Sequence, residues 1–183
     1  MNAVRRGLLG LMGTLLVSGA SEAGDRKAKR SSVKPRHVLC FLGGAHALAP
    51  GPVVVANVGT ALTIDAVSAS GLHRGGAIVP GPATMVTSLL SGTHGIRRRA
   101  NGGRAKSSSL FASDTASALA AGSMFAAAAF IDRAVLEAQR ELKGRPRLLL
   151  TGGGAPALQR YLKSPARFVP DLVLRGLAEF AKP

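Results

Sequence analysis

The sequence has few cysteines, aromatic residues and acidic side chains, and each shortage excludes a class of protein. Its 183 residues include one cysteine, Cys40, one tyrosine and no tryptophan. A single cysteine cannot form an internal disulfide or a cysteine-based zinc site, so we expect a reducing compartment. The histidines lack the spacing of metal ligands; they are His37, His46, His73 and His94. The sequence therefore predicts neither a disulfide scaffold nor a histidine metal site.

The shortage of acids leaves a strongly basic chain, with 24 Lys and Arg against 9 Asp and Glu and a net charge of +15. The basic residues gather in two Gly- and Ser-rich stretches, 26–36 and 97–106. Neither stretch has the interleaved aromatic residues that stack on bases, and no helix-turn-helix or RRM pattern is present. We interpret the charge as solvated surface and expect no nucleic-acid partner. A basic secreted or nucleic-acid-binding protein is the alternative.

Residues 1–39 differ in composition from the rest of the chain. A basic start (1–6), an apolar run (7–17) and small residues (18–23) together resemble a secretory signal that is too short to span a membrane. A wrong start codon or a shifted reading frame would also give such Arg-, Gly- and Ala-rich text, and we favour this interpretation. We expect residues 1–39 to lie outside the fold, residues 40–183 to form one lobe, and no later stretch to be long and apolar enough to cross a membrane.

From residue 42 the pattern predicts an α/β fold with a mixed sheet and flanking helices. β-branched runs, alternation, glycine turns and helical spacing indicate the elements. They are strands at 53–56, 61–67, 73–79 and 147–150, turns at 57–60, 70–71 and 151–154, helices at 83–91, 115–143, 155–162 and 171–180, and an exposed loop at 92–109.

Two of the glycine turns have the composition of phosphate-binding loops. The turn at 57–60 contains Gly59 and Thr60, whose free amides and hydroxyl can donate to a phosphate. The turn at 151–154 contains three glycines between a strand and a helix, where many α/β proteins bind nucleotides. It matches neither a Walker A loop nor GxGxxG. Each turn alone is compatible with an ordinary structural turn, but two of them at strand ends favour a nucleotide cleft.

The few acids between the turns are most simply structural. Asp114 and Asp171 precede helices and are expected to cap them. Asp132 is expected on exposed helix surface. Asp65, in a strand, is either a structural acid or a polar group near the cleft.

The order of these motifs resembles the type III pantothenate kinases, also called CoaX or Baf-type proteins. The resemblance covers about 140 residues and rests on the stretches 59–65 (GTALTID), 75–81 (GGAIVPG), Thr115 with Gly122, 151–153 (TGG) and 171–177 (DLVLRGL). It implies one lobe of an actin-like, ribonuclease-H-like fold and ATP-dependent phosphorylation of pantothenate, the first step of coenzyme A biosynthesis. It also implies Mg²⁺ with ATP, a monovalent cation (K⁺ or NH₄⁺), and a cytoplasmic homodimer with pantothenate at the subunit interface.

The resemblance also assigns roles to individual residues. Gly59 and Thr60 would contact the phosphates of ATP, and Gly152 and Gly153 would line the adenosine side. Thr115 would hydrogen-bond pantothenate. The stretch 75–81 would shape the strand and turn beside the cleft and the dimer contact.

The chain departs from the family pattern in three places. Nothing matches the first phosphate loop, Asp-x-Gly-Asn-Ser/Thr. The position of the Gly-x-Asp-Arg motif falls near 34–37, which has no carboxylate to act as general base. The Asp expected before the Gly-Thr turn is Asn57, whose amide oxygen can still coordinate a monovalent cation. We therefore predict little or no kinase activity for this chain, and a non-catalytic nucleotide-binding or dimerising protein of the same fold is the alternative.

Overall fold

The computed structural model describes residues 45, 48–49, 51–100 and 109–180. The segment 1–39, its signal-like features and the basic cluster within it lie outside the described residues, so the expectations for them stay predictions. The same holds for the part of the predicted loop that falls at 101–108.

The described residues form a five-stranded mixed sheet of order β3-β2-β1-β4-β5. Its strands are β1 (Val53–Val58), β2 (Ala61–Val67), β3 (His73–Pro80), β4 (Arg147–Thr151) and β5 (Ala166–Phe168). The first three strands form an antiparallel meander. Strand β4 pairs with β1 in parallel, and β5 pairs with β4 in parallel. β1 and β4 read as nearly continuous apolar runs because both of their faces are buried, as is usual for central strands with helices on both sides.

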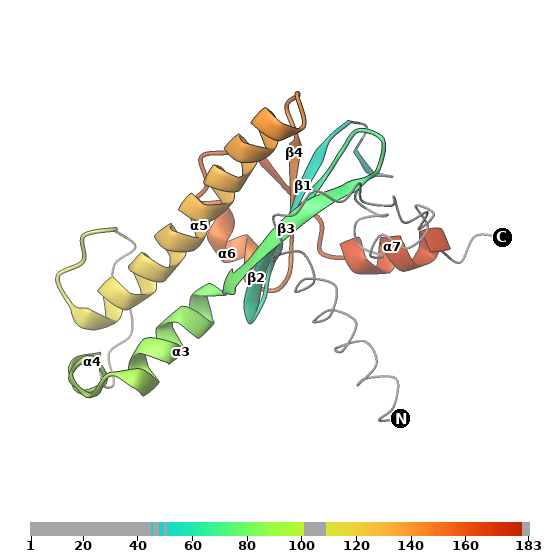
Figure 1. Ribbon diagram of the computed structural model, residues 1–183. Helices are drawn as coiled ribbons and strands as arrows, with labels where there is room; N and C mark the ends of the chain where they lie inside the picture. Colours follow the sequence, from blue (N-terminus) through green and yellow to red (C-terminus); the bar gives the residue numbers. More distant parts are fainter. Residues whose placement is uncertain (1–44, 46–47, 50, 101–108, 181–183) are drawn as a thin grey trace, which may run out of the picture. The chain divides into compact units, whose positions relative to one another are not determined.

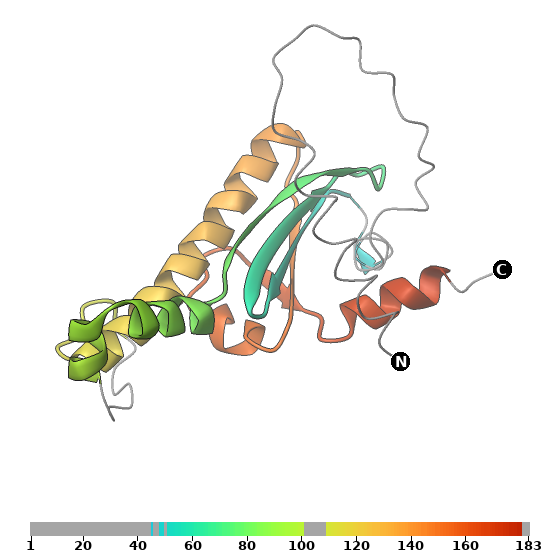
Figure 2. The same cartoon turned by 60° about the horizontal axis from the view of Figure 1, so that its bottom comes forward.

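Helices pack on both faces of this sheet and against one another (Figure 1). They are α3 (Pro82–Gly92), α4 (His94–Ala100), α5 (Thr115–Glu141), α6 (Ala155–Gln159) and α7 (Leu172–Phe180). One core lies between the sheet and α5 with α6, and a second lies on the opposite face, where Leu172 of α7 meets Ala45 and Ala49. Figure 2 shows α3 and α4 beside the N-terminal part of α5. This architecture confirms the predicted α/β fold with a mixed sheet and flanking helices.

Helix α5 begins where the sequence predicts. The Asp114 carboxylate accepts hydrogen bonds from the Ser117 amide at 2.8 Å and from the Ser117 hydroxyl at 2.7 Å, which confirms its capping role. The expectation that no stretch could cross a membrane was wrong for α5, which is long and apolar enough by length and composition alone. Its buried residues, Ile131 and Val135 among them, pack against the sheet in the first core.

Several boundaries differ from the prediction. Residues 94–100, expected in an exposed loop, form α4, and Arg97 donates from Nε to the Leu90 carbonyl at 2.7 Å and from Nη2 to that of Ser91 at 2.9 Å. The Arg97 side chain thus satisfies carbonyls at the end of α3, which solvated charge would not do. The turn predicted at 57–60 is shorter, because Asn57 and Val58 belong to β1. Helix α6 ends early, at Gln159, and the short strand β5 was not predicted.

The contact with Asp65 explains why β3 has a glycine at position 76. The two residues face each other in register, and a Cβ on Gly76 would collide with the Ile64 carbonyl and lie 2.6 Å from Asp65 Oδ1. The space left by Gly76 admits the buried Asp65 carboxylate, which is 2.9 Å from His73 Nε2. Asp65 is therefore a structural acid that joins β2 to β3, one of the two roles expected for it.

Asp132 is not simply exposed helix surface. Its two carboxylate oxygens accept hydrogen bonds from the backbone amides of Lys163 and Ser164, at 3.0 and 2.9 Å. These bonds hold the segment between α6 and β5 against α5. No local pattern marks them, because the partners are main-chain groups 31 and 32 positions away.

We expect Asp132→Ala to lower the free energy of unfolding by about 1–3 kcal/mol, because two amides lose a charged acceptor. Glu137→Ala on the same helix is the control. Within the described part of the chain, Glu137 forms ion pairs only with the exposed Arg133 and Arg140, so its loss should cost less than about 1 kcal/mol. Urea denaturation of both variants measures the difference, and equal midpoints would show that the Asp132 contacts do not stabilise the fold.

Candidate functional site

The two glycine turns, far apart in the sequence, meet at one cavity of about 670 Å³. Gly59 and Thr60 line it from the β1–β2 turn, and Gly153 and Gly154 line it from the turn after β4. The parallel pairing of β1 with β4 brings the two turns to the same end of the sheet. The remaining lining residues come from the end of β1, the start of α3, α5 and α6; they are Val58, Pro82, Ala83, Thr84, Thr87, Met124 and Ala157.

Gly152 does not line the cavity but holds the second turn against β1. Its φ is +91°, and a Cβ there would lie 2.5 Å from both Asn57 Oδ1 and the Val58 carbonyl oxygen. The Gly154 amide donates to that carbonyl at 3.0 Å. Only glycine allows this conformation and this approach without strain. The structure thus places Gly152 and Asn57 side by side beneath the turn, and Gly153 at its surface.

The start of α3 is fixed to the other turn. The carbonyl oxygen of Thr60 accepts from the Gly81 amide at 2.8 Å and from the Thr84 hydroxyl at 2.6 Å. A Cβ on Gly81 would collide with the Gly59 carbonyl, so glycine is required where the helix approaches the turn. Pro82 occupies the first turn of α3, where its missing N–H costs no hydrogen bond.

The donors that face this cavity suit an anion. Within the described part of the chain, the amides of Thr60 and Gly153 have no acceptor, and neither does the Thr60 hydroxyl. The first amides of α3 add the partial positive charge of a helix N-terminus. Among the described residues that line the cavity there is no Asp or Glu. The cavity can therefore bind a phosphate-bearing ligand, but its described walls offer no general base.

Thr115 lies elsewhere. It lines a separate hollow of about 430 Å³ between α3, α4 and α5, with apolar neighbours such as Met85, Leu89 and Ile96. The structure therefore brings Gly59, Thr60 and Gly153 together but does not bring Thr115 to them.

Sequence reasoning missed Gly154 and Thr84 as parts of the site. Gly154 belongs to the predicted glycine turn at 151–154, so the sequence could have assigned it to the site. Thr84 is an ordinary helix residue in the sequence, and only the contact between α3 and the β1–β2 turn shows its place.

A comparison with known protein families shows to which family the chain belongs. The family model described as type III pantothenate kinase matches residues 37–137, more than half of the chain. The chain belongs to the type III pantothenate kinase family. The match includes the β1–β2 turn, β3, α3, α4 and most of α5, and it confirms the resemblance seen in the sequence.

Curated type III pantothenate kinases show the same relationship. The chain is 42% identical to the protein of Nitrosococcus oceani over 130 residues, which are 71% of this chain and 48% of the relative. It is 47% identical to that of Stenotrophomonas maltophilia over 137 residues, 75% of this chain and 54% of the relative. The chain thus spans about half the length of the curated relatives it matches.

A solved structure shares the fold. It is described as a Baf family transcriptional activator from Campylobacter jejuni and superposes with a TM-score of 0.53 at 22% identity. The superposition covers 83% of this chain and 65% of that chain.

Proposed function

We propose that this type III pantothenate kinase chain supplies the ATP-side lobe for phosphorylation of pantothenate to 4′-phosphopantothenate, the first step of coenzyme A biosynthesis. The observation that carries the proposal is the cavity where Gly59 and Thr60 meet Gly153. Family membership and this arrangement of donors support it together. We further propose that the protein acts in the cytoplasm.

The proposed roles follow from where each residue lies. Thr60 donates its amide and hydroxyl to the phosphates of ATP, and Gly59 leaves room for them to approach. Gly153 lines the adenosine side, and Gly152 keeps that turn in place. Magnesium would enter with ATP, because the described lining offers hydroxyls and amides but no carboxylate to hold the ion by itself.

Asn57 is the proposed ligand of the monovalent cation. Its side-chain oxygen lies beside Gly152 and the Val58 carbonyl, and such neutral oxygens suit K⁺. The neighbourhood of amide and carbonyl oxygens supports the assignment, although Asn57 contributes no charge.

Thr115 is the proposed pantothenate contact, and it fits the proposal that the kinase is a homodimer. The apolar hollow at Thr115 lies between α3 and α5, away from the glycine turns. A pantothenate bound there would need a second subunit's ATP site near its hydroxyl, which is what a site at a subunit interface provides.

A non-catalytic nucleotide-binding protein is the second candidate. The absence of any carboxylate from the described lining of the glycine cavity favours it, because the hydroxyl of pantothenate must lose a proton during phosphoryl transfer.

Nucleotide binding tests the common part of both candidates. We expect Thr60→Val to weaken binding of a non-hydrolysable ATP analogue about tenfold, because a hydroxyl donor to a charged phosphate is lost. Thr63→Val is the matched control, since Thr63 lies in β2 and does not line the cavity. Isothermal titration calorimetry measures both affinities. Equal losses in the two variants would place the nucleotide outside the glycine cavity.

Turnover separates the two candidates. We expect the chain alone to form 4′-phosphopantothenate at least about 10²-fold more slowly than a family member that carries the Gly-x-Asp-Arg motif, because a positioned base contributes about 10²–10⁴-fold. Mass spectrometry of the product measures the rate. A rate equal to that of a full-length relative would contradict the non-catalytic candidate.

A further inference from the structure

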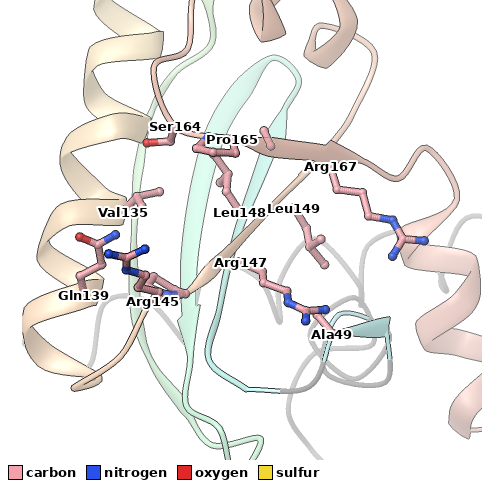
Figure 3. A pocket seen from close by; sticks show the side chains of 12 residues that line it. Ala49, Val135, Gln139, Arg145, Arg147, Leu148, Leu149, Ser164, Pro165 and Arg167 are labelled. Carbon is pink, nitrogen blue, oxygen red and sulfur yellow. The ribbon is translucent and has the colours of Figure 1, made fainter.

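A second cavity lies at the corner of the sheet, at the opposite end of β4 from the glycine turns. It measures about 690 Å³ and is lined by Arg145, Arg147 and Arg167, together with Gln139, Ser164 and apolar residues (Figure 3). We propose that this arginine hollow, defined by these three arginines, binds a small anion that carries two or more phosphate groups. The proposal does not depend on the function proposed for the glycine cavity.

The hollow exists because β5 is short. Its three residues pair with Leu148, Leu149 and Leu150 of β4, so Arg147 extends past the point where β5 begins. The segment before β5 turns away at Ser164 and Pro165, where Asp132 holds it. The corner of the sheet is therefore open beside Arg147.

The register of the two strands brings two of the arginines together. Arg167 faces Leu149 across the strands, and Arg147 is two residues before Leu149. Side chains two residues apart on a strand share a face, so Arg147 and Arg167 lie on the same face of the sheet. Figure 3 shows both side chains extending to that side, while Arg145 lies near Gln139 of α5.

The Cα atoms of Arg147 and Arg167 should be roughly 8 Å apart, given the strand spacing of about 4.8 Å and a rise of about 3.3 Å per residue. Two guanidinium groups on such long side chains can converge on a single diphosphate. This geometry favours a ligand with adjacent phosphates over a single small ion.

The charges of the hollow are not neutralised within the described residues. In that part of the chain, no Asp or Glu lines the hollow, and no side-chain hydrogen bond or ion pair involves Arg145, Arg147 or Arg167. The acids on the nearby helix are already engaged: Asp132 with two backbone amides, and Glu137 with arginines of its own helix. An incoming anion at Arg147 and Arg167 therefore meets two positive charges without competition from these carboxylates, and Arg145 adds a third charge on the α5 side of the hollow.

The chemistry of the lining favours phosphate in a small molecule. Guanidinium groups bind phosphate oxygens in a bidentate manner, which an ammonium cannot do. The volume lies within the range of small-molecule sites, about 300–1,000 Å³, and the prolines and leucines of the wall can cover an apolar part of the ligand.

Pyrophosphate in metal-free buffer is the probe, measured by calorimetry with the full chain. We expect the double variant Arg147→Gln/Arg167→Gln to weaken its binding at least about tenfold, since two charged hydrogen-bonding groups are lost. The matched control is Arg98→Gln/Arg99→Gln, which removes the same charge from exposed positions on α4. It should change the affinity less than about twofold. Circular dichroism should show the same fold for all three proteins.

Two further measurements distinguish the arginine hollow from the glycine cavity and from a general attraction of polyanions to a basic protein. Thr60→Val should leave the arginine-dependent binding unchanged, because the glycine cavity is at the other end of β4. A loss of pyrophosphate binding in Thr60→Val with none in Arg147→Gln/Arg167→Gln would overturn the proposal. The proposal would also be overturned if the wild-type protein did not bind pyrophosphate, or if both double variants lost affinity equally. A single-stranded oligonucleotide is the second measurement. The proposal would be overturned if the oligonucleotide bound more tightly than pyrophosphate and its binding fell equally in the two double variants.

Discussion

Gly152→Ala should destabilise the fold more than any other glycine-to-alanine substitution in the two turns at the glycine cavity. The change forces alanine into a φ of +91° and places its Cβ 2.5 Å from Asn57 Oδ1 and the Val58 carbonyl oxygen. Backbone strain of about 1–3 kcal/mol and a packing cost of similar size add to a loss of about 2–6 kcal/mol in the free energy of unfolding. Urea denaturation followed by circular dichroism measures this loss.

Gly153→Ala is the control for this prediction. The neighbouring glycine has no positive φ and no atom within 4 Å of an added Cβ, so the same substitution should change stability by less than about 0.5 kcal/mol. Because Gly153 lines the cavity, its methyl group would act on the ligand and not on the fold. If Gly152→Ala were as stable as Gly153→Ala, the second turn would not be held against β1 as described.

Ile131→Ala should have an effect of similar size through the core. Ile131 is fully buried between α5 and the sheet, among residues such as Val54 and Leu150. Removal of its side chain loses buried apolar area and leaves a cavity that the rigid sheet cannot fill, which costs about 2–5 kcal/mol. Chemical denaturation gives the value directly.

Leu136→Ala on the same helix provides the comparison. Leu136 is 51% exposed, so its truncation should cost less than about 1 kcal/mol. The two variants also test whether α5 packs against the sheet through its buried face, because the length and composition of this helix alone would also suit a membrane span. Equal losses for Ile131→Ala and Leu136→Ala would show that α5 does not use the buried face seen here.

Most of the strands and helices could be predicted from patterns among neighbouring residues in the sequence. The β-branched run at Val53, the alternation after Ala61 and the Asp114 cap each act through neighbours in the sequence, so their strands and helix were found nearly at the correct bounds. The same patterns predicted a mixed sheet with flanking helices, and the sheet topology confirms it.

The missed features depend on contacts that the local sequence pattern does not show. Strand β5 exists because β4 offers an edge to pair with. Residues 94–100 contain one glycine and three arginines and have a loop-like composition; the contact of Arg97 with the end of α3, seven positions earlier, shows only in the structure. Asp132 resembles any surface acid until the two amides that it binds are known.

The candidate site was partly predictable for the same reason. Glycines in turns mark Gly59 and Gly153, but the sequence does not reveal that Gly152 supports the turn while its neighbour lines the cavity. The arginine hollow had no sequence signal, because its members come from separate strands and a loop.

The parallel pairing of Val53 with Arg147 has a consequence for how the chain folds. The β1–β2–β3 meander joins residues close in sequence and can form early, whereas β4 reaches β1 only after the helices between them have closed a long loop, which is slow. Both cavities need β4 in place. Ligand binding therefore reports a late stage of folding. A protein that binds a ligand at either cavity has completed its sheet, and a folding intermediate that contains only the meander binds at neither.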